Sequence, residues 1–141
     1  MIPRILTLFV FALLLFSCGN DIEEMKNNLN GYWEIHEVEK DGKLIKAYTI
    51  NVKVDYFELN NDSTGFRKKV SPNLDGTFVV TQHQMPFVLR DNKGALQILY
   101  SDNGVTHEET IIEASAEQLR IENDRGYVYT YKPFEGININ E

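Results

Sequence analysis

The sequence predicts an all-β fold with eight or nine antiparallel strands, preceded by one short helix. Three observations predict it. From Gly31 onward, turn-forming residues recur about every ten residues. Between the turns, β-branched and aromatic residues alternate with polar ones, which is the period of a half-buried strand. Only residues 21–29 show helical spacing of apolar side chains. The length of 141 residues is that of one domain.

The composition limits the classes of function. The net charge is −7, so the chain has no electrostatic reason to approach a phosphate backbone, and nucleic-acid binding is not expected. Hydrophobic residues make up 43% and charged residues 25%, which is typical of a globular protein. A single cysteine excludes an intramolecular disulfide framework and a cysteine-based zinc cluster.

Residues 1–17 predict a secretory signal peptide. A positive start at Arg4 precedes an apolar or near-apolar stretch from Ile5 to Phe16. A signal peptide carries about 7–15 such residues, whereas a membrane-spanning helix needs about 20. Polar residues follow at once, so the segment indicates export and not a transmembrane anchor.

The sole cysteine follows directly, in Leu15-Phe16-Ser17-Cys18. This motif resembles the lipobox of bacterial lipoproteins, in which a small residue precedes an invariant cysteine. The resemblance implies that Cys18 becomes a diacylglyceryl cysteine at the mature N-terminus, with acyl chains such as palmitate holding the protein at a membrane. Each buried methylene contributes about 0.8 kcal/mol to that attachment. A plain signal peptide that ends near a cysteine is the alternative.

Residues 18–30 are expected to form the lipidated tether and a short helix. Gly19, and not Asp, follows the cysteine, and by the same resemblance this implies the outer membrane of the cell envelope, with the periplasmic or surface face left open. Asp21 can cap the helix, and Met25 and Leu29 fall on one of its faces. A helix this short persists only when it packs against another element.

The rest of the chain is expected to alternate between strands and tight turns. Asp41-Gly42 and Asn103-Gly104 tolerate the positive φ angles that hairpin turns require. The strands are expected at residues 32–39, 48–59, 64–70, 77–82, 85–91, 95–101, 104–113, 117–122 and 126–133. So many antiparallel strands avoid exposed edges by closing into a barrel or by forming a sandwich, and the residues alone leave both open. Residues 134–141 are expected to be a C-terminal tail.

Short motifs resemble a known family. Gly31-Tyr32-Trp33 is similar to the Gly-x-Trp motif that opens lipocalin barrels. Phe57-Glu58-Leu59, the turn at 62–65, and the run from 110 to 121 resemble a hairpin and the closing strands of bacterial lipocalin-like domains. Over about residues 29–133 the chain thus resembles the lipocalin-like lipoproteins of Bacteroidetes. The resemblance implies an up-and-down barrel of the lipocalin or calycin type over residues 31–133.

The interior of that barrel is the candidate site. An eight-stranded barrel is just wide enough to be filled by side chains or to hold one small ligand. We expect the inward positions to be apolar or aromatic, and a tyrosine suits a pocket wall because it joins an apolar body to a polar tip. The candidate ligand-binding residues are Trp33, Val52, Val54, Phe66, Phe87, Leu96, Ile98, Tyr127, Tyr129 and Tyr131. The alternative is that these side chains pack on one another as an ordinary core.

Catalysis and metal binding have little support in the sequence, and an enzyme or a haem protein on the same scaffold is a remote alternative. His36, His83 and His107 fall on separate expected strands, without the spacing of metal ligands. The chain contains no Gly-x-Ser-x-Gly elbow, phosphate loop or two-histidine metal motif. We therefore expect no metal, no cofactor and no enzyme activity.

The sequence thus predicts a lipid-anchored protein of the cell envelope that binds a small hydrophobic ligand in its barrel. The alternative is a filled barrel that acts as an interaction or assembly module for another envelope protein at the outer membrane. The interior volume distinguishes the two, and the sequence does not supply it.

Overall fold

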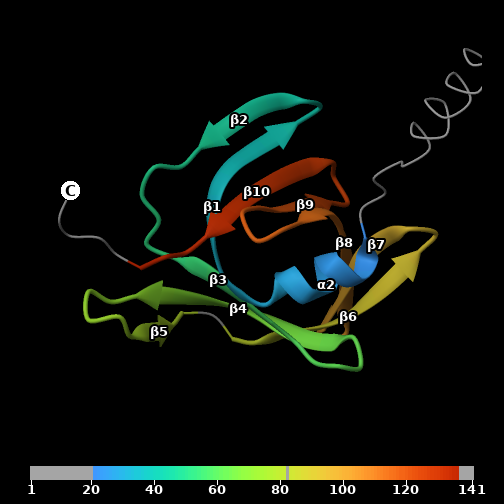
Figure 1. The fold of residues 1–141 in the computed structure, drawn as a ribbon, viewed down its shortest axis with the longest axis horizontal. Coiled ribbons are helices and arrows are strands. Elements are labelled where there is room, and N and C mark those ends of the chain that lie inside the picture. The colour runs from blue at the N-terminus through green and yellow to red at the C-terminus, as the bar shows by residue number, and fades with distance from the viewer. Residues whose placement is uncertain (1–20, 82, 137–141) are drawn as a thin grey trace, which may run out of the picture.

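The computed structural model describes residues 21–81 and 83–136, and over these the chain folds into an antiparallel β-barrel with a short helix (Figure 1). The expected signal peptide, Cys18 and the end of the expected tail lie outside the described residues. The elements in chain order are α2 (Ile22–Leu29), β1 (Gly31–Lys40), β2 (Lys43–Ala47), β3 (Val54–Leu59), β4 (Thr64–Pro72), β5 (Phe78–Val80), β6 (Met85–Asn92), β7 (Ala95–Asp102), β8 (Val105–Ala114), β9 (Leu119–Asn123) and β10 (Tyr127–Pro133).

The barrel is closed because β1 pairs with β10 as well as with β3. Around the ring the order is β1, β3, β4, β6, β7, β8, β9 and β10, so each strand pairs with the next ring strand along the chain. β2 extends from β1 as a hairpin and β5 pairs with the end of β4, both outside the ring. The expected eight-stranded, up-and-down antiparallel barrel is therefore confirmed, and the sandwich is not formed.

Local sequence explains the helix and the tight turns. The Asp21 side chain accepts a hydrogen bond of 3.0 Å from the Glu23 amide, which caps α2 as expected. Asn103 and Gly104 adopt φ angles of 50° and 80° in the turn between β7 and β8. Glycine reaches this region without steric cost and asparagine tolerates it, so the turn residues expected from the sequence fix where the strands end.

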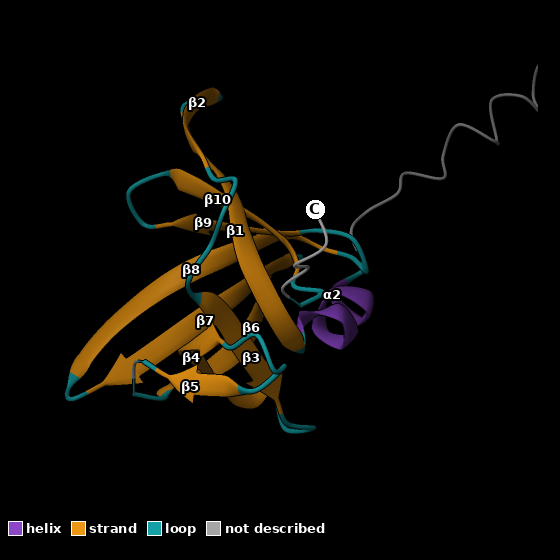
Figure 2. Cartoon of the chain, turned by 90° about the vertical axis from the view of Figure 1, so that its left-hand side faces the viewer, coloured by secondary structure: helices purple, strands orange, loops and turns teal. Residues whose placement is uncertain are grey.

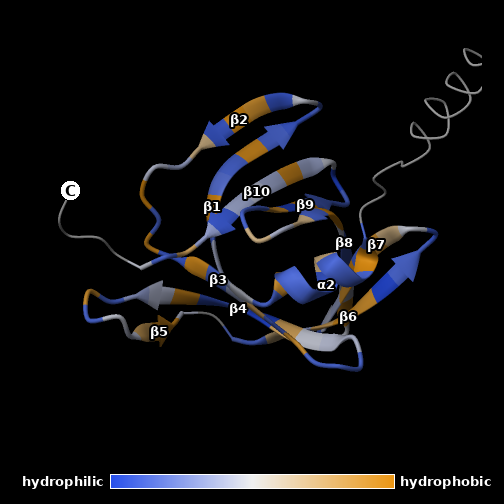
Figure 3. Cartoon of the chain, in the orientation of Figure 1, coloured by the Kyte–Doolittle hydropathy of each residue, from blue (hydrophilic) through white to orange (hydrophobic). Residues whose placement is uncertain are grey.

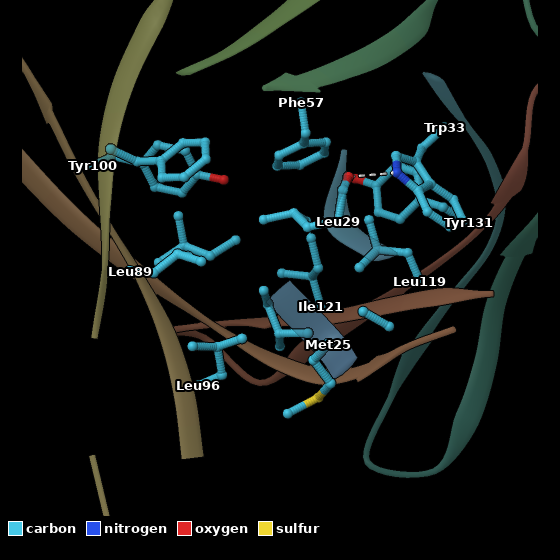
Figure 4. Packing of buried hydrophobic residues seen from close by; sticks show 14 residues of the cluster. Met25, Leu29, Trp33, Phe57, Leu89, Leu96, Tyr100, Leu119, Ile121 and Tyr131 are labelled. Carbon is cyan, nitrogen blue, oxygen red and sulfur yellow. Dashed lines mark hydrogen bonds between the residues drawn. The ribbon is translucent and has the colours of Figure 1, made fainter. Parts of the chain in front are cut away.

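The hydrophobic core fills the end of the barrel that α2 covers, as Figures 2 and 4 show. Met25 and Leu29 of the helix point into it, and the Trp33 indole donates a hydrogen bond of 2.9 Å to the Leu29 carbonyl oxygen. The other buried members are Phe57, Phe87, Leu89, Leu96, Ile98, Tyr100, Ile111, Ala114, Leu119, Ile121 and Tyr131. These side chains fill the interior at this end, and helix α2 covers it.

Two strand predictions are wrong. The strand expected at 48–59 begins only at Val54, and residues 43–47, for which no strand was expected, form β2. Residues 48–53, called here the seam segment, run beside β1 without forming a strand. The Tyr48 amide donates to the His36 carbonyl oxygen (2.8 Å), and the Asn51 side chain donates to the Ile35 carbonyl oxygen (2.8 Å). β1 and β3 pair over only three residues and then diverge. The seam segment fills the gap between them.

No helix among residues 21–81 and 83–136 has the length and hydrophobicity that crossing a bilayer requires.

Candidate ligand-binding site

A cavity of about 440 Å³ lies beyond the packed core, between the seam segment and the inner face of the barrel. Strands β1, β3, β4, β8 and β10 and the seam segment contribute its walls. The apolar and aromatic part of the lining comes from the seam segment, β1 and β10, and consists of Ile35, Tyr48, Ile50, Val52, Tyr129 and Tyr131. The polar part comes mainly from β3, β4 and β8, and consists of Asn51, Lys53, Asp55, Arg67, Lys69 and Glu109. The cavity therefore has one apolar side and one charged side.

Arg67 forms the centre of the charged side. Its Nε donates to Asp55 Oδ1 at 3.2 Å, and its Nη1 donates to Glu109 Oε2 at 3.1 Å. The same Nη1 reaches Tyr100 Oη at 3.1 Å, and Nη2 donates to Tyr131 Oη at 2.9 Å. Four strands are thereby tied to one guanidinium group, which presents its donors in a fixed planar fork.

The same guanidinium group rests on the aromatic core. Its carbon lies 4.9 Å from the ring centre of Phe57 and 5.9 Å from that of Tyr131, within the range of a cation–π contact. Phe57 belongs to the packed core, whereas Tyr131 lines the cavity as well. Arg67 therefore lies between the packed core and the cavity.

The charges of this group balance. Lys69 Nζ donates to both carboxylate oxygens of Asp55, at 3.1 and 3.2 Å, and Tyr100 Oη donates to Glu109 Oε2 at 2.9 Å. Two cations, Arg67 and Lys69, thus meet two carboxylates inside the barrel. Buried charges are tolerated when they are paired and hydrogen-bonded, as they are here.

Burial and charge shift the pKa values of the groups around Arg67. Burial alone raises the pKa of Asp55, but the positive charges of Arg67 and Lys69 outweigh it and hold that pKa below its usual value. Burial raises the pKa values of Tyr100 and Tyr131 well above that of a free tyrosine. At neutral pH the site therefore offers one ionised aspartate, protonated phenols and a permanent guanidinium charge.

The residues expected to bind ligand are placed in three different surroundings. Val52, Tyr129 and Tyr131 line the cavity. Trp33, Phe87, Leu96 and Ile98 are buried in the packed core at the helix end. Tyr127 is half-buried near the tip of β10, where Lys40 Nζ lies 4.5 Å from its ring centre. Whether any of these residues binds a ligand stays a prediction.

Val54 and Phe66 were expected to face inward, and the structure places them otherwise. Successive side chains of a strand point to opposite faces, and Asp55, Phe57 and Arg67 occupy the inner face. Val54 and Phe66 therefore lie on the opposite face of β3 and β4. Val54 is still buried there, with 1% of its surface exposed, and the ring of Phe66 lies 6.0 Å from that of Tyr56. The inward expectation fails because charged side chains take the interior positions.

Sequence reasoning missed the polar residues of the site, namely Asp55, Arg67, Lys69 and Glu109. Hydropathy alternation places such residues outside. The signal that identifies them is cross-strand register, because Asp55 stands directly opposite Lys69 in the ladder of β3 and β4. An opposite-charge pair at facing positions stabilises a sheet and allows both groups to be turned inward.

The three histidines stand apart from one another. His36 Nε2 lies 3.5 Å from Glu37, His83 Nε2 lies 2.8 Å from Asp102, and the His107 ring stacks on Tyr100 with 4.5 Å between ring centres. Among the described residues, no three His, Cys, Asp or Glu side chains gather in a way that holds a metal ion.

Comparison with known proteins gives one match. The family model described as lipocalin-like domain matches residues 29–121, which span β1 to β9 and the last residue of α2. The matched region includes the seam segment and the four charged residues of the cavity. No match was found among curated proteins or among solved structures.

Proposed function

The chain belongs to the lipocalin-like domain family, and on that premise we propose that it binds one small, largely hydrophobic ligand in the cavity beside Arg67. The observation that carries this proposal is the cavity itself. Its volume of about 440 Å³ lies in the range of small-molecule sites, which usually combine apolar walls with a few fixed polar groups. The lipocalin-like fold supports the same class of function.

The two sides of the cavity define how such a ligand lies in it. Its apolar body packs on the side formed by the seam segment and β10, against Ile50, Val52 and Tyr129. Its polar group faces the charged side, where Lys69 is partly exposed while Arg67 is already bonded to four partners. The ligand is therefore amphipathic. Arg67 and Lys69 are matched by Asp55 and Glu109, and Lys53 adds one further positive charge to the lining. A polar group that is neutral or carries a single negative charge therefore fits the site best.

We propose further that the protein is a lipoprotein of the cell envelope, held at the outer membrane through acyl chains on Cys18. The apolar stretch at 5–16 and the lipobox-like motif at 15–18 support this. We also propose a non-enzymatic role, which is supported by the lack of a nucleophile elbow, a phosphate loop or a two-histidine metal motif in the sequence.

Ligand binding is tested with the chain purified gently from cells and analysed by native mass spectrometry. The expected result is a reproducible additional mass that is lost on denaturation. A second measurement titrates the delipidated protein with an apolar fluorophore, and saturable binding to one site is expected. The informative variant is Val52→Trp, because a larger side chain at this lining position fills the cavity from an exposed segment without touching the core.

The matched control is Val80→Trp, which places the same side chain on the outer strand β5 at another exposed valine. We expect Val52→Trp to weaken fluorophore binding at least about tenfold, equivalent to about 1.4 kcal/mol, and Val80→Trp to leave it unchanged. An apo mass together with no saturable binding contradicts the proposal. Equal effects of both variants place the binding outside this cavity.

The anchor has its own test. Cells that produce the chain with Cys18→Ser are expected to release it into the soluble fraction, while the unaltered chain sediments with membranes. Mass spectrometry of the N-terminal peptide is expected to show acyl chains on Cys18. An unmodified cysteine on a membrane-associated protein overturns this part of the proposal and leaves ligand binding untouched.

The second candidate function is an interaction module for another envelope protein. The packed core favours it, since Trp33, Phe87, Leu96 and their neighbours fill the interior at the end that α2 covers. In that case the cavity binds nothing and the functional surface is external. Cross-linking in intact cells is expected to recover a specific protein under this alternative, together with a clean apo mass.

A further inference from the structure

The hairpin of β1 and β2 exposes aliphatic side chains where it projects away from the barrel wall (Figure 2). Every residue of β2 is exposed, and Leu44 and Ile45 each show 59% of their surface to solvent. In the adjoining seam segment, Ile50 and Val52 are 84% and 73% exposed. Figure 3 shows orange within β2 and within the connection to β3, with blue beside it in both stretches. Exposed aliphatic residues gathered in this way mark a surface that another apolar phase covers.

The same segment is basic in an acidic chain. Residues 40–53 contain four lysines, Lys40, Lys43, Lys46 and Lys53, against the single acidic residue Asp41. The whole sequence carries a net charge of −7, so this segment has the opposite sign to the molecule. A long lysine side chain can lay its methylenes along an apolar phase while its ammonium group stays at the polar boundary.

Two glutamates of β1 beside the hairpin already contact other side chains. On β1, Glu39 accepts from Arg120 Nη2 at 3.2 Å, and Glu37 lies 3.5 Å from His36 Nε2. Lys40 donates to the Arg125 carbonyl oxygen at the neighbouring tip between β9 and β10, which fixes the hairpin beside that turn. The hairpin tip therefore presents lysine ammonium groups and aliphatic side chains together.

These features favour one occupant over the others. Pairing of the free edge of β2 with a second copy is opposed by Lys43 and Lys46, since lysines on an edge strand hinder strand addition. Lysine is also depleted from protein–protein interfaces. Aliphatic side chains flanked by lysines suit the boundary of an anionic lipid bilayer, where each lysine near the surface adds to the attraction.

We propose that the β1–β2 hairpin docks on the surface of an anionic phospholipid bilayer. Leu44 and Ile45 insert among the acyl chains, and Lys43 and Lys46 lie at the lipid phosphates. Because the seam segment follows β2 directly and lines the cavity, the docked hairpin places the cavity wall next to the membrane. This contact stands independently of any ligand and of any acyl anchor.

The test uses the chain without its leader and with Cys18→Ser, so that no acyl chain contributes. This form keeps the whole core, which lies between Met25 and Tyr131. It is sedimented with vesicles of phosphatidylcholine mixed with phosphatidylglycerol, and with vesicles of phosphatidylcholine alone. We expect binding to the anionic vesicles only, weakening as NaCl rises from about 0.05 to about 0.5 M.

Two pairs of substitutions assign the contact to the hairpin. Lys43→Glu with Lys46→Glu, and separately Leu44→Ser with Ile45→Ser, are each expected to weaken vesicle binding more than about tenfold, since one lysine is equivalent to about fivefold. The matched controls are Lys93→Glu, in the turn between β6 and β7, and Val79→Ser with Val80→Ser on β5. Both controls are expected to bind as the parent does.

A fluorescence measurement distinguishes insertion from loose electrostatic attraction. Leu44→Trp is expected to shift its emission to shorter wavelength when anionic vesicles are added, while the parent, with only the buried Trp33, shows no shift. The proposal is overturned if the parent does not bind anionic vesicles, or if the control variants weaken binding as much as the hairpin variants do. It is also overturned if the emission of Leu44→Trp stays unchanged when anionic vesicles are added.

Discussion

At the scale of single residues, the barrel interior depends on Arg67. One guanidinium group satisfies two carboxylates and two phenols from β3, β7, β8 and β10. Removing it leaves Asp55 and Glu109 buried without their main partner, and breaking a buried pair costs about 3–5 kcal/mol. We expect Arg67→Met to lower the free energy of unfolding by that amount, measured by urea denaturation.

The matched control for Arg67 is Arg90, whose side chain is half exposed and bonds Gln97 on the outer face of β6 and β7. We expect Arg90→Met to cost less than about 1 kcal/mol, because exposed ion pairs are weak. Arg67→Lys is expected to recover only part of the loss, since an ammonium group cannot reproduce the planar fork. A cost for Arg67→Met as small as that for Arg90→Met contradicts the central role of Arg67.

The depressed pKa of Asp55 makes stability depend on pH. In the unfolded chain this carboxyl group has the ordinary pKa near 4, and in the folded barrel its pKa is lower. As the pH falls below about 4 the unfolded chain binds the proton first, so the stability contributed by Asp55 is lost as pH falls through the folded pKa. Urea midpoints between about pH 7 and about pH 2 are expected to fall less steeply in Asp55→Asn than in the parent. If the urea midpoints of the two proteins fall in parallel with pH, the predicted contribution of Asp55 is wrong.

The single residues that hydropathy predicts correctly are those whose surroundings are apolar. Trp33, Leu96 and Ile98 were expected inside and are buried. Asp55 and Arg67 were missed because the free energy of a buried charge depends on its partners across the sheet, which one strand does not reveal. Which residues of β3 and β4 face the interior thus depends on charge pairs between the two strands. The hydropathy pattern along one strand alone places these charged residues on the wrong face.

At the scale of elements, most strands and the helix follow from local signals. The capped helix and the strands beside the turns at 103–104 and 93–94 begin and end within a few residues of the expected positions. The segment from 43 to 59 is the exception. Its apolar residues Ile50, Val52, Val54 and Tyr56 alternate as in a strand, yet the backbone of the seam segment bonds β1 only at isolated points. Alternation in the sequence shows only which side chains are apolar. A segment forms a strand only if it can also pair, in register, with the free edge of another strand.

The hairpin of β3 and β4 depends on a close approach at Gly65. A Cβ atom on Gly65 would lie 2.2 Å from the Glu58 carbonyl oxygen and 2.7 Å from the Phe87 ring. Backbone cannot yield as a flexible side chain does, so we expect Gly65→Ala to lower the free energy of unfolding by about 1–3 kcal/mol or more. Thermal unfolding followed by circular dichroism measures it.

The control for Gly65 is Gly42, in the turn between β1 and β2, where a Cβ meets nothing within 4 Å but φ is +72°. Asparagine tolerates that conformation, so Gly42→Asn is expected to cost less than about 1 kcal/mol. If Gly65→Ala costs no more than Gly42→Asn, the hairpin accommodates the added methyl group and the argument from close approach fails.

At the scale of the whole molecule, closure joins the first strand to the last. Trp33 stands opposite Pro133, and the Phe134 amide donates to the Tyr32 carbonyl oxygen at 2.9 Å. No local signal in the sequence reports this ladder, because its residues come from opposite ends of the chain. The alternation of residues alone therefore left barrel and sandwich open. The resemblance to lipocalins indicated the barrel, and the structure confirms it.

The closed ring predicts that the chain tolerates circular permutation. Joining Gly136 to Asp21 through a flexible linker, with new ends between Asn103 and Gly104, keeps every ladder of the barrel. We expect this permutant to unfold cooperatively in urea. A permutant with its new ends between Ile98 and Leu99, inside β7, interrupts a buried strand and is expected not to fold. If neither permutant folds, the barrel depends on where the chain begins and the prediction is wrong.

The pairing of β1 with β10 also sets the order of events during synthesis. Seven residues of β1 pair with residues 127–133, so this ladder cannot form before β10 has been made. Contacts between distant parts of a chain form slowly, because the loop between them must close first. The barrel of a nascent chain therefore stays open until β10 has emerged. For the export that we propose for this chain, such a delay is an advantage, because it keeps the chain in the extended state that a narrow translocation channel accepts.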